Sequence, residues 1–349
     1  MRVALIASPF IEVPPRHYGG TELFIARLAE GLKAQGVDVV VYANGASTVN
    51  VERRWLYREP QWPIEGDIYD NLKDINHSFW SVRDASEDCD IIHLNNVPAL
   101  AASRFVKQPF VYTIHHPHVP GLSEYFADYP QVQYVTISDF QLREEQMPYM
   151  RTIRHGIRMD NFEVNLGPRE YLAFLGRIAP MKGTHLAIEV AKRTGIPLKI
   201  AGEVQPLFQE YYDREIKPHI DGKLIEYVGE VGLKEKNELL GKARAFLFPI
   251  QWNEPFGLVM VEAMACGTPV IALQGGSVPE VVKPGVSGAI CANVDEMVSA
   301  VQEGKFEPEV VRRYVEENFT VERMTRDYLA VYEEALARAG EKTPEGRVA

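Results

Sequence analysis

Short hydrophobic runs alternate with amphipathic stretches along the first half of the chain. The runs are VALIA (3–7), VDVVVYA (37–43), DIIHL (90–94), FVYTI (110–114) and VQYVTI (132–137). Short, nearly continuous apolar runs are typical of strands buried on both faces. Residues from Thr21 have a helical period that ends at Gly36, a residue suited to the end of a helix. This β-α-β alternation predicts a parallel sheet covered by helices.

The same alternation starts again in the second half of the chain. Its runs are YLAFLG (171–176), PLKIAG (197–202), LIEYVG (224–229), AFLFPI (245–250) and TPVIAL (268–273). Residues 151–170 between the two sets are polar, contain glycine and have no helical period, so we expect the linker there. The pattern predicts an α/β protein of two Rossmann-like domains that face each other across a cleft, with a ligand at the carboxyl ends of the strands.

The end of the chain has the period of one long amphipathic helix, from Val321 to about Ala339. Its apolar face is made by Met324, Tyr328, Val331, Tyr332 and Leu336, which recur every three or four residues. The last residues, EKTPEGRVA, are predicted to fray.

Composition narrows the class of protein. The chain has 349 residues, of which 46% are hydrophobic, and a net charge of −11. Acidic residues outnumber basic ones in both halves, which argues against a nucleic-acid partner. Three distant cysteines indicate a reducing compartment and lack zinc-ligand spacing. The apolar start is too short for a signal peptide, and no run could span a bilayer, so we expect a cytoplasmic protein.

Two glutamates in the stretch EPFGLVMVEAMACGTPVIA are the first candidates for chemistry. Glu254 lies just before a predicted helix at 257–265, and Glu262 lies more than one turn inside it. The helix start offers free N–H groups to an anion, while a carboxylate can accept two sugar or ribose hydroxyls. They therefore suit two parts of one elongated ligand. The alternative is that Glu254 caps the helix and Glu262 pairs with a cation.

Two further loops add to this pattern. Arg177 and Lys182 lie in FLGRIAPMKG, where two cations after a strand suit a diphosphate leaving group; a solvated charged loop is the alternative. Gly19 and Gly20 lie just before the first predicted helix, where the backbone can approach phosphate or sugar.

Together these motifs resemble the retaining glycosyltransferases of family 4, which have the GT-B fold. The resemblance covers nearly the whole chain, and its most specific element is Glu254-x7-Glu262 around PFGL. It implies an acceptor-side domain at 1–158, a donor-side domain at 159–322, and a C-terminal helix with its tail, 323–349, that returns to the N-terminal domain. It further implies a nucleotide diphosphate sugar as donor substrate and no cofactor.

The resemblance also implies a role for individual residues. Glu254 would contact the transferred sugar and Glu262 the ribose, while Arg177 and Lys182 would neutralise the diphosphate. The remaining donor-binding residues would be Gly20 with its neighbour Gly19, then Gly229, Glu230 and Val231 near the base, and Phe256, Gly257 and Leu258 near sugar and phosphate. With Arg177 and Lys182 in that role no metal is expected.

The histidines of YTIHHPH allow two interpretations. His115 follows a strand and matches the family histidine near the reacting sugar. A metal site made of His115, His116 and His118 is the weaker interpretation, because nothing in this stretch would converge the three rings. The stretch DCD at 88–90 resembles the Asp-x-Asp metal motif of the other glycosyltransferase fold, but it precedes a strand and is expected to be a turn away from the ligand edge.

The sequence leaves the acceptor and several rival functions open. It departs from the family at Arg154-His155-Gly156-Ile157 and at His93-Leu94-Asn95-Asn96, which lie at the hinge or on the acceptor side. The acceptor could be a sugar, a lipid or a glycan, and VERRWLYREPQWP (51–63) could touch a membrane or be an ordinary strand and loop. An epimerase, a phosphorylase, a nicotinamide-dependent oxidoreductase and a non-catalytic nucleotide-sugar sensor remain as alternatives to hexosyl transfer.

Overall fold

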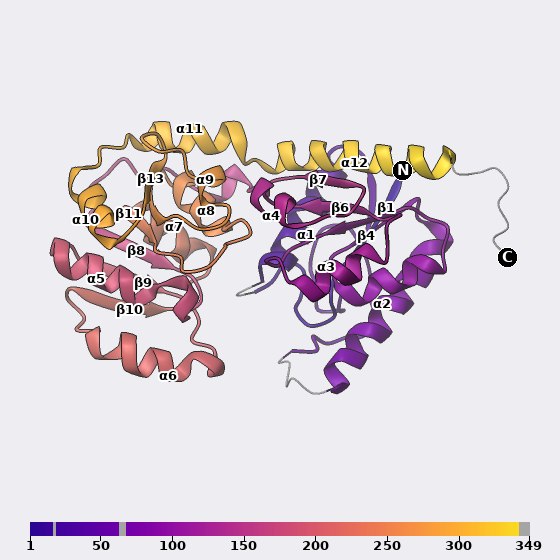
Figure 1. Ribbon diagram of the computed structural model, residues 1–349, viewed down its shortest axis with the longest axis horizontal. Helices are drawn as coiled ribbons and strands as arrows, with labels where there is room; N and C mark the ends of the chain where they lie inside the picture. Colours follow the sequence, from indigo (N-terminus) through magenta and orange to yellow (C-terminus); the bar gives the residue numbers. More distant parts are fainter. Residues whose placement is uncertain (17–18, 63–67, 342–349) are drawn as a thin grey trace. The chain divides into compact units, whose positions relative to one another are not determined.

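The chain forms two compact α/β units in a computed structural model that describes residues 1–16, 19–62 and 68–341. One unit comprises Met1–Gly156 together with the chain from Val321 onwards, and the other comprises Ile157–Thr320 (Figure 1). Among the described residues, no helix combines the length and the apolar character needed to cross a membrane.

A seven-stranded parallel sheet of order β3-β2-β1-β4-β5-β6-β7 forms the centre of the N-terminal unit. Its strands are β1 (Arg2–Ile6), β2 (Asp38–Tyr42), β3 (Glu52–Arg54), β4 (Ile91–Leu94), β5 (Phe110–Thr113), β6 (Gln133–Thr136) and β7 (Met150–Thr152). Five of them cover the predicted runs. The edge strands β3 and β7 are short and not buried, so they lack an apolar run. Because β7 reaches Thr152, the expectation that the linker starts at 151 was wrong by two residues.

Helices cover both faces of this sheet. Val3 and Leu5 of β1 pack in one apolar cluster with α1 (Gly20–Ala34) and α12 (Val321–Glu341). Ala4 and Ile6, which point the other way, pack in a second cluster. That second face is covered by α2 (Ile68–Asp88), a 3-10 helix (Val97–Arg104) and α3 (Pro120–Ala127), and the short α4 (Asp139–Glu144) lies between β6 and β7. A strand with two buried faces explains the unbroken apolar run at 3–7.

The C-terminal helix α12 packs on the N-terminal unit, as predicted. It begins at Val321 and contacts α1. Tyr328 and Tyr332 are fully buried; the Tyr328 hydroxyl lies 2.9 Å from Thr113 Oγ1 and the Tyr332 hydroxyl 2.7 Å from His93 Nδ1. Residues 342–349, which were predicted to fray, lie outside the described residues.

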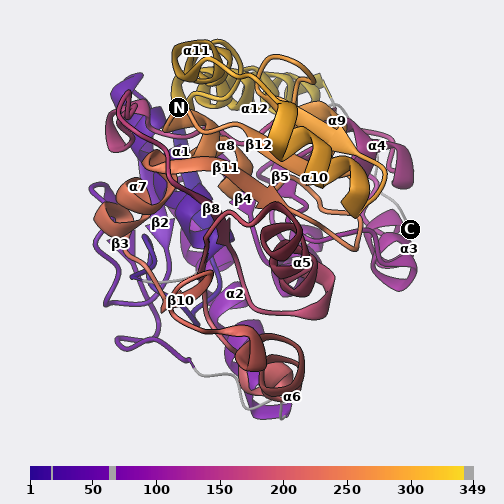
Figure 2. The same cartoon turned by 90° about the vertical axis from the view of Figure 1, so that its left-hand side faces the viewer.

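A six-stranded parallel sheet of order β10-β9-β8-β11-β12-β13 forms the centre of the C-terminal unit. Its strands are β8 (Tyr171–Leu175), β9 (Leu198–Ala201), β10 (Ile225–Gly229), β11 (Ala243–Phe248), β12 (Val270–Leu273) and β13 (Gly288–Cys291). Helices α5 (Thr184–Thr194) and α10 (Val294–Glu303) pack on one face, which is turned toward the viewer in Figure 2. The remaining α-helices of this unit are α6 (Gln209–Tyr211), α7 (Leu233–Gly241), α8 (Leu258–Ala265), α9 (Val278–Val281) and α11 (Pro308–Asn318).

Both sheets have a point where the chain changes its direction of winding. In the C-terminal unit it falls between β8 and β11, and in the N-terminal unit between β1 and β4. Loops that leave two such neighbouring strands diverge to opposite faces and leave a crevice at the carboxyl edge, where open α/β sheets bind ligands. The loops after β8 and β11 contain Arg177, Lys182 and Glu254.

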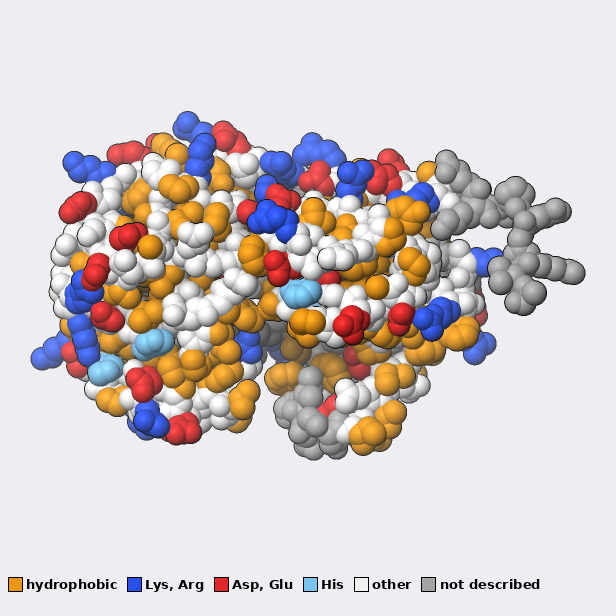
Figure 3. All heavy atoms as spheres, viewed as in Figure 1, with side chains coloured by type: hydrophobic (Ala, Val, Ile, Leu, Met, Phe, Trp, Pro, Cys, Tyr) orange, Lys and Arg blue, Asp and Glu red, His pale blue; other side chains and the backbone are white. Residues whose placement is uncertain are grey.

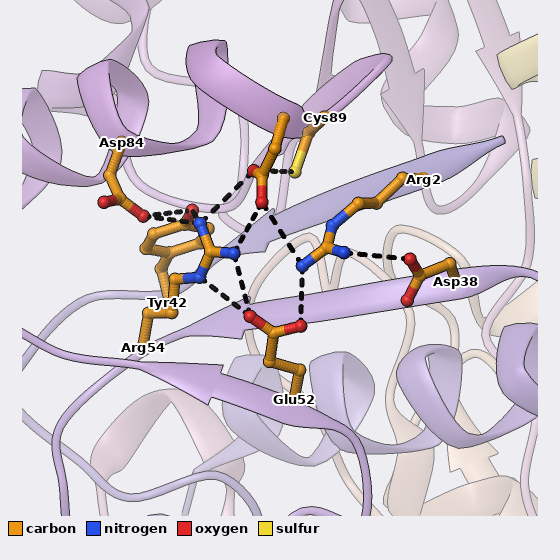
Figure 4. A network of polar contacts seen from close by, with 8 residues as sticks. Arg2, Asp38, Tyr42, Glu52, Arg54, Asp84 and Cys89 are labelled. Atoms are coloured by element: carbon orange, nitrogen blue, oxygen red, sulfur yellow. Dashed lines mark hydrogen bonds and ion pairs between the residues drawn. The ribbon is translucent and has the colours of Figure 1, made fainter.

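An ion-pair network joins Arg2, at the amino end of β1, to β3 and to the end of α2 (Figure 4). Arg54 lies 2.7 Å from Asp84 and 2.6 Å from Asp88, and Arg2 lies 2.6 Å from Glu52. The Arg54 guanidinium holds the pKa of Asp88 below its ordinary value. Asp88 ends α2 and β4 begins at Ile91, so the stretch DCD at 88–90 is a helix-to-strand turn, as predicted.

Charges on the molecular face of Figure 3 are interspersed, with basic and acidic side chains side by side and no continuous basic field. The segment 51–62 forms β3 and a loop, in which Trp55 and Trp62 are exposed while Arg54 belongs to the ion-pair network. A contact of this segment with a membrane stays a prediction, and its last residue, Pro63, lies outside the described residues.

Candidate functional site

Lys182 and Glu254 form the centre of the candidate site. Lys182 ends the short 3-10 turn Pro180–Lys182 after β8, and Glu254 lies in the loop between β11 and α8. Lys182 Nζ lies 2.5 Å from Glu254 Oε2, and both side chains are nearly buried. The indole Nε1 of Trp252 donates a 2.8 Å hydrogen bond to the same oxygen. Lys182 Nζ also lies 4.8 Å from the centre of the Trp252 ring. Glu254 therefore does not cap the helix; it belongs to an ion pair.

The backbone of this loop is held from two sides. Ser277, after β12, donates from its N–H to the Glu254 carbonyl and from its hydroxyl to the Phe256 carbonyl, both at 2.9 Å. The Gln251 N–H donates to the Met181 carbonyl at 2.8 Å, which ties this loop to the one that carries Lys182. The position of Glu254 is thus fixed by main-chain contacts as well as by its ion pair.

Helix α8 starts at Leu258, one residue later than predicted, and its N-terminal cap is Gly257. Gly257 has φ of 80°, a left-handed conformation that favours glycine. A Cβ there would also lie 2.6 Å from Met260 Cε. Neither glutamate caps this helix, since no side chain accepts from its first turn. The N–H of Met260 donates to the Gly257 carbonyl at 2.9 Å. The remaining N–H groups at the start of the helix, near Phe256, Gly257 and Leu258, suit an anion.

Glu262 lies in α8 and is 4% exposed. Its Oε2 accepts from Lys236 Nζ of α7 at 2.9 Å, so the expected pairing with a cation exists. The loop between β10 and α7 holds the other predicted base-side residues. Gly229 ends β10 with φ of 79°, and Glu230 and Val231 follow it directly.

Arg177 has partners other than the Lys182–Glu254 pair. Its Nη1 donates to Gln205 Oε1 at 3.2 Å, and its guanidinium carbon lies 5.9 Å from the centre of the Phe208 ring. The structure therefore joins Lys182 to Glu254 and places Arg177 in the same loop but beside the segment after β9.

The other predicted residues lie in the N-terminal unit. His115 follows β5, and its Nε2 lies 2.9 Å from Asn95 Oδ1. The Asn95 amide nitrogen donates to the Ile6 carbonyl, so Oδ1 faces His115 and Nε2 must donate. His115 Nδ1 is then an acceptor. Burial, together with neighbouring His155 and His93, holds the pKa of His115 well below its ordinary value, so the ring is neutral at physiological pH.

The neighbouring histidines do not converge with His115. His116 Nδ1 lies 2.8 Å from the Pro117 carbonyl oxygen, and His118 Nδ1 lies 3.1 Å from Glu145. Among residues 1–16, 19–62 and 68–341, no group of three potential ligands is placed to hold a metal ion. At the start of α1, Gly19 is the cap and Gly20 the first residue; a Cβ on Gly20 would meet nothing within 4 Å, whereas one on Gly19 would lie 2.8 Å from Pro15 Cβ.

Sequence reasoning missed three residues that contact the predicted ones: Trp252, Lys236 and Asn95. Trp252 lies two residues before Glu254, and this closeness was the only available signal. Lys236 is 26 residues from its partner, and Asn95 is 20 residues from His115. Only the folded sheet order brings these pairs together.

A hollow of about 480 Å³ opens on the α5 and α10 side of the C-terminal sheet. It is lined by Leu186, Ile250, Gln251, Trp252, Asn253, Leu273, Gln274, Gly275, Ala292, Asn293 and Val294. No predicted site residue lines it, and its lining carries no charged side chain. A diphosphate requires cations or free N–H groups, so we place the candidate site at Lys182 and Glu254 instead.

Most of the chain matches two known protein families. Residues 159–317 match the family described as Glycosyl transferases group 1, and residues 18–142 match Glycosyltransferase Family 4. Among curated proteins, the chain is 25% identical to a glycogen synthase of Mycobacterium tuberculosis, over 100% of this chain and 98% of that protein. It is 27% identical to a phosphatidyl-myo-inositol mannosyltransferase of Mycobacterium leprae, over 83% and 85%.

Solved structures share the fold. A sucrose-phosphate synthase from Thermosynechococcus elongatus has a TM-score of 0.79 at 18% identity, covering 97% of this chain and 99% of that one. The Anabaena protein HepE in complex with UDP-glucose has a TM-score of 0.75 at 16% identity, covering 96% and 100%. The predicted fold, two Rossmann-like units of the GT-B kind, is thereby confirmed.

Two parallel α/β units and these matches define a glycosyltransferase that uses a nucleotide-sugar donor. The chain belongs to glycosyltransferase family 4. This membership decides against the nicotinamide-dependent oxidoreductase that the sequence had left as an alternative.

Proposed function

We propose that this glycosyltransferase moves a hexosyl group, with retention of anomeric configuration and without a metal ion, from a nucleotide diphosphate sugar to a hydroxyl acceptor. The Lys182–Glu254 contact carries the proposal. A cation and a carboxylate lie side by side in the loops after β8 and β11, where the chain changes its direction of winding in the C-terminal sheet. A cation there can take up the charge of a leaving diphosphate, and a carboxylate can orient sugar hydroxyls.

The donor occupies the C-terminal unit in this proposal. Its diphosphate lies at the start of α8, near Phe256, Gly257 and Leu258, with Lys182 and Arg177 as counter-charges. Glu262 binds the ribose, and the base lies against the loop that begins at Gly229, Glu230 and Val231. Lys236 holds the Glu262 carboxylate in its orientation. Relatives whose names specify glycogen synthesis and mannosyl transfer support a hexosyl donor.

The N-terminal unit supplies the acceptor side. His115 contacts the reacting sugar as a neutral ring that accepts a hydrogen bond at Nδ1, with Gly19 and Gly20 at the neighbouring loop. Because its ring stays neutral, His115 does not act as an acid. The acceptor is a sugar, a lipid or a glycan that offers a hydroxyl.

The reaction then needs no carboxylate nucleophile. The bond between the anomeric carbon and the diphosphate oxygen breaks, the acceptor oxygen forms a bond to the same face of that carbon, and the acceptor proton passes to the leaving phosphate oxygen. Lys182 and Arg177 stabilise the developing charge on the diphosphate.

Donor hydrolysis tests the proposal without knowledge of the acceptor. The wild-type enzyme is incubated with UDP-, GDP- and ADP-linked hexoses in the presence of EDTA, and the released nucleoside diphosphate and the first-formed anomer of the sugar are measured by NMR. We expect release from one donor with retained configuration, and a loss of about 100-fold in Glu254→Gln. Glu226→Gln, which breaks a surface Lys–Glu pair in the same unit, is the control.

An inverted product, or activity that appears only with added divalent metal, would contradict the proposal. A requirement for inorganic phosphate would indicate a phosphorylase on the same scaffold.

A further inference from the structure

Two polar contacts of Glu254 fall on one of its two oxygens. Lys182 Nζ and Trp252 Nε1 both donate to Oε2, at 2.5 and 2.8 Å. The other oxygen, Oε1, accepts from no residue that the structure describes and stays open to solvent. The carboxylate is thus held by one oxygen and presents the other.

Trp252 contacts both members of this ion pair. Its N–H holds Glu254, and its ring face lies 4.8 Å from Lys182 Nζ, within the range of a cation–π contact. An aromatic residue that served only to fill the loop would not need to aim its single donor at Glu254, because that donor could be satisfied by a carbonyl or by water.

Binding of a diphosphate would change the balance at Lys182. In the structure its charge is matched by Glu254, whereas a diphosphate offers more negative charge and several oxygens. If Lys182 turns toward the diphosphate, Glu254 loses its cation. Among the described residues, the Trp252 N–H is then the donor whose hydrogen bond still holds the Glu254 carboxylate in place.

We propose that Trp252 is a positioning residue for the donor sugar: its indole N–H keeps Glu254 Oε2 in place while Lys182 exchanges Glu254 for the donor diphosphate, so that Oε1 meets the sugar hydroxyls. This inference rests on the function proposed above. It assigns to Trp252 a share in distinguishing a nucleotide sugar from the bare nucleoside diphosphate.

The variant Trp252→Phe separates the two contacts of the side chain, since it keeps an aromatic ring beneath Lys182 and removes the N–H. Affinities for UDP, GDP and ADP and for their glucose-linked forms are measured by calorimetry, with kcat and KM for donor hydrolysis. We expect the nucleoside diphosphate affinity to stay within about twofold, while the affinity for the nucleotide sugar and kcat/KM fall by about 10- to 100-fold, the loss for a hydrogen bond to a charged group. Trp80→Phe, in the other unit, controls for the loss of an indole.

The outcomes are distinct. If Trp252→Phe loses both affinities equally, its role is structural; if it keeps both, it has no role in sugar binding. Either result overturns the inference and leaves the proposed function standing. If no nucleotide or nucleotide sugar binds the wild-type protein, the proposed function fails and the inference fails with it.

A measurement on the unaltered sequence guards against a variant that does not fold. The chain contains four tryptophans, so protein labelled with 5-fluorotryptophan gives four fluorine NMR signals. The signals of the other three are assigned by their loss in Trp55→Phe, Trp62→Phe and Trp80→Phe, and the fourth belongs to Trp252. We expect saturating diphosphate to shift this signal as Lys182 leaves the ring. A Trp252 signal that does not move on diphosphate binding would overturn the exchange of Lys182.

Discussion

Lowering the pH from 7.0 to 5.5 should destabilise the N-terminal unit through its buried histidines. Burial lowers the pKa of His77 to about 4 and the pKa values of His93 and His155 to about 3, and lowers that of His115 in the same direction. An unfolded histidine titrates near 6.5. At pH 5.5 these residues are neutral in the folded protein and protonated in the unfolded chain. The unfolded state therefore binds more protons, and the free energy of unfolding falls as the pH falls.

The magnitude follows from the proton uptake of the unfolded state. Each histidine contributes a loss of about 1.3 kcal/mol between pH 7.0 and 5.5, so that His77, His93 and His155 together contribute about 4 kcal/mol. This result hardly depends on the folded values, as long as they lie below about 5. The carboxyls of Asp74 and Glu22 act in the opposite direction, since burial raises the pKa of both, that of Asp74 to about 6; Asp74 offsets about 0.8 kcal/mol. A net loss of about 3 kcal/mol is large beside a typical domain stability of about 5–15 kcal/mol.

Urea unfolding at the two pH values, with hydrogen exchange in β1, β4 and β5 to report on the N-terminal unit, measures this loss. The variant His77→Gln should reduce the pH-dependent loss by about 1.3 kcal/mol, whereas His219→Gln, in the C-terminal unit, should leave it unchanged. Equal stability at pH 7.0 and 5.5, or an unchanged loss in His77→Gln, would refute the reasoning.

Three further predictions concern thiols, a glycine and the ion-pair network. Burial raises the pKa of Cys89 and Cys266 to about 12 and that of Cys291 to about 11, so a thiol reagent at pH 8 should label none of them in the native protein and all three in urea. Gly257→Ala and Gly36→Ala should each lower the free energy of unfolding by about 1–2 kcal/mol, because both glycines are left-handed. Only Gly257→Ala should weaken nucleotide binding, because Gly257 caps α8 whereas Gly36 follows α1. Equal nucleotide affinities of the two variants would refute the role of the α8 start. Asp84→Asn should lower the free energy of unfolding by about 1 kcal/mol and leave donor hydrolysis unchanged, since Asp84 lies in α2 and pairs with Arg54 in the N-terminal unit. A fall in hydrolysis by the fully folded variant would contradict this expectation.

The central strands could be predicted from the sequence because they are buried on both faces. Val3 to Ile6 alternate between two apolar clusters and therefore form an unbroken apolar run. The edge strands at Glu52–Arg54 and Met150–Thr152 are not buried and leave no such run. Burial on both sides, rather than strand character itself, makes a parallel strand visible in a sequence.

Helix α2 shows a different limit. Its exposed residues include Ile68, Leu72, Ile75 and Phe79, while its buried residues include His77, Ser78 and Ser81. Up to Ser81 the apolar side chains thus point outward and polar groups point inward, the reverse of an ordinary surface helix. Only the last turns bury apolar residues, Val82 and Ala85. A pattern argument on this segment would place the wrong face on the sheet.

The sequence was enough to select the charged residues of the candidate site, but it did not reveal the residues that hold them in place. Lys182 and Glu254 follow strands that are distant in sequence, and the change of winding between β8 and β11 brings them to 2.5 Å. Partners such as Lys236 and Asn95 act through long-range contacts that no local spacing reveals. The roles of these residues toward a donor stay predictions.

Nucleoside diphosphate binding to the C-terminal unit is the measurement to make first. Thermal unfolding is followed with UDP, GDP, ADP, dTDP and NAD, each without added metal, for the wild type, for Glu262→Gln and for the control Glu226→Gln. At 100 times its dissociation constant a ligand stabilises the protein by about 2.7 kcal/mol. We predict stabilisation by one nucleoside diphosphate, kept in Glu226→Gln and largely lost in Glu262→Gln. Stabilisation by NAD alone, by none of these ligands, or to the same extent in Glu262→Gln would contradict a donor site at α8.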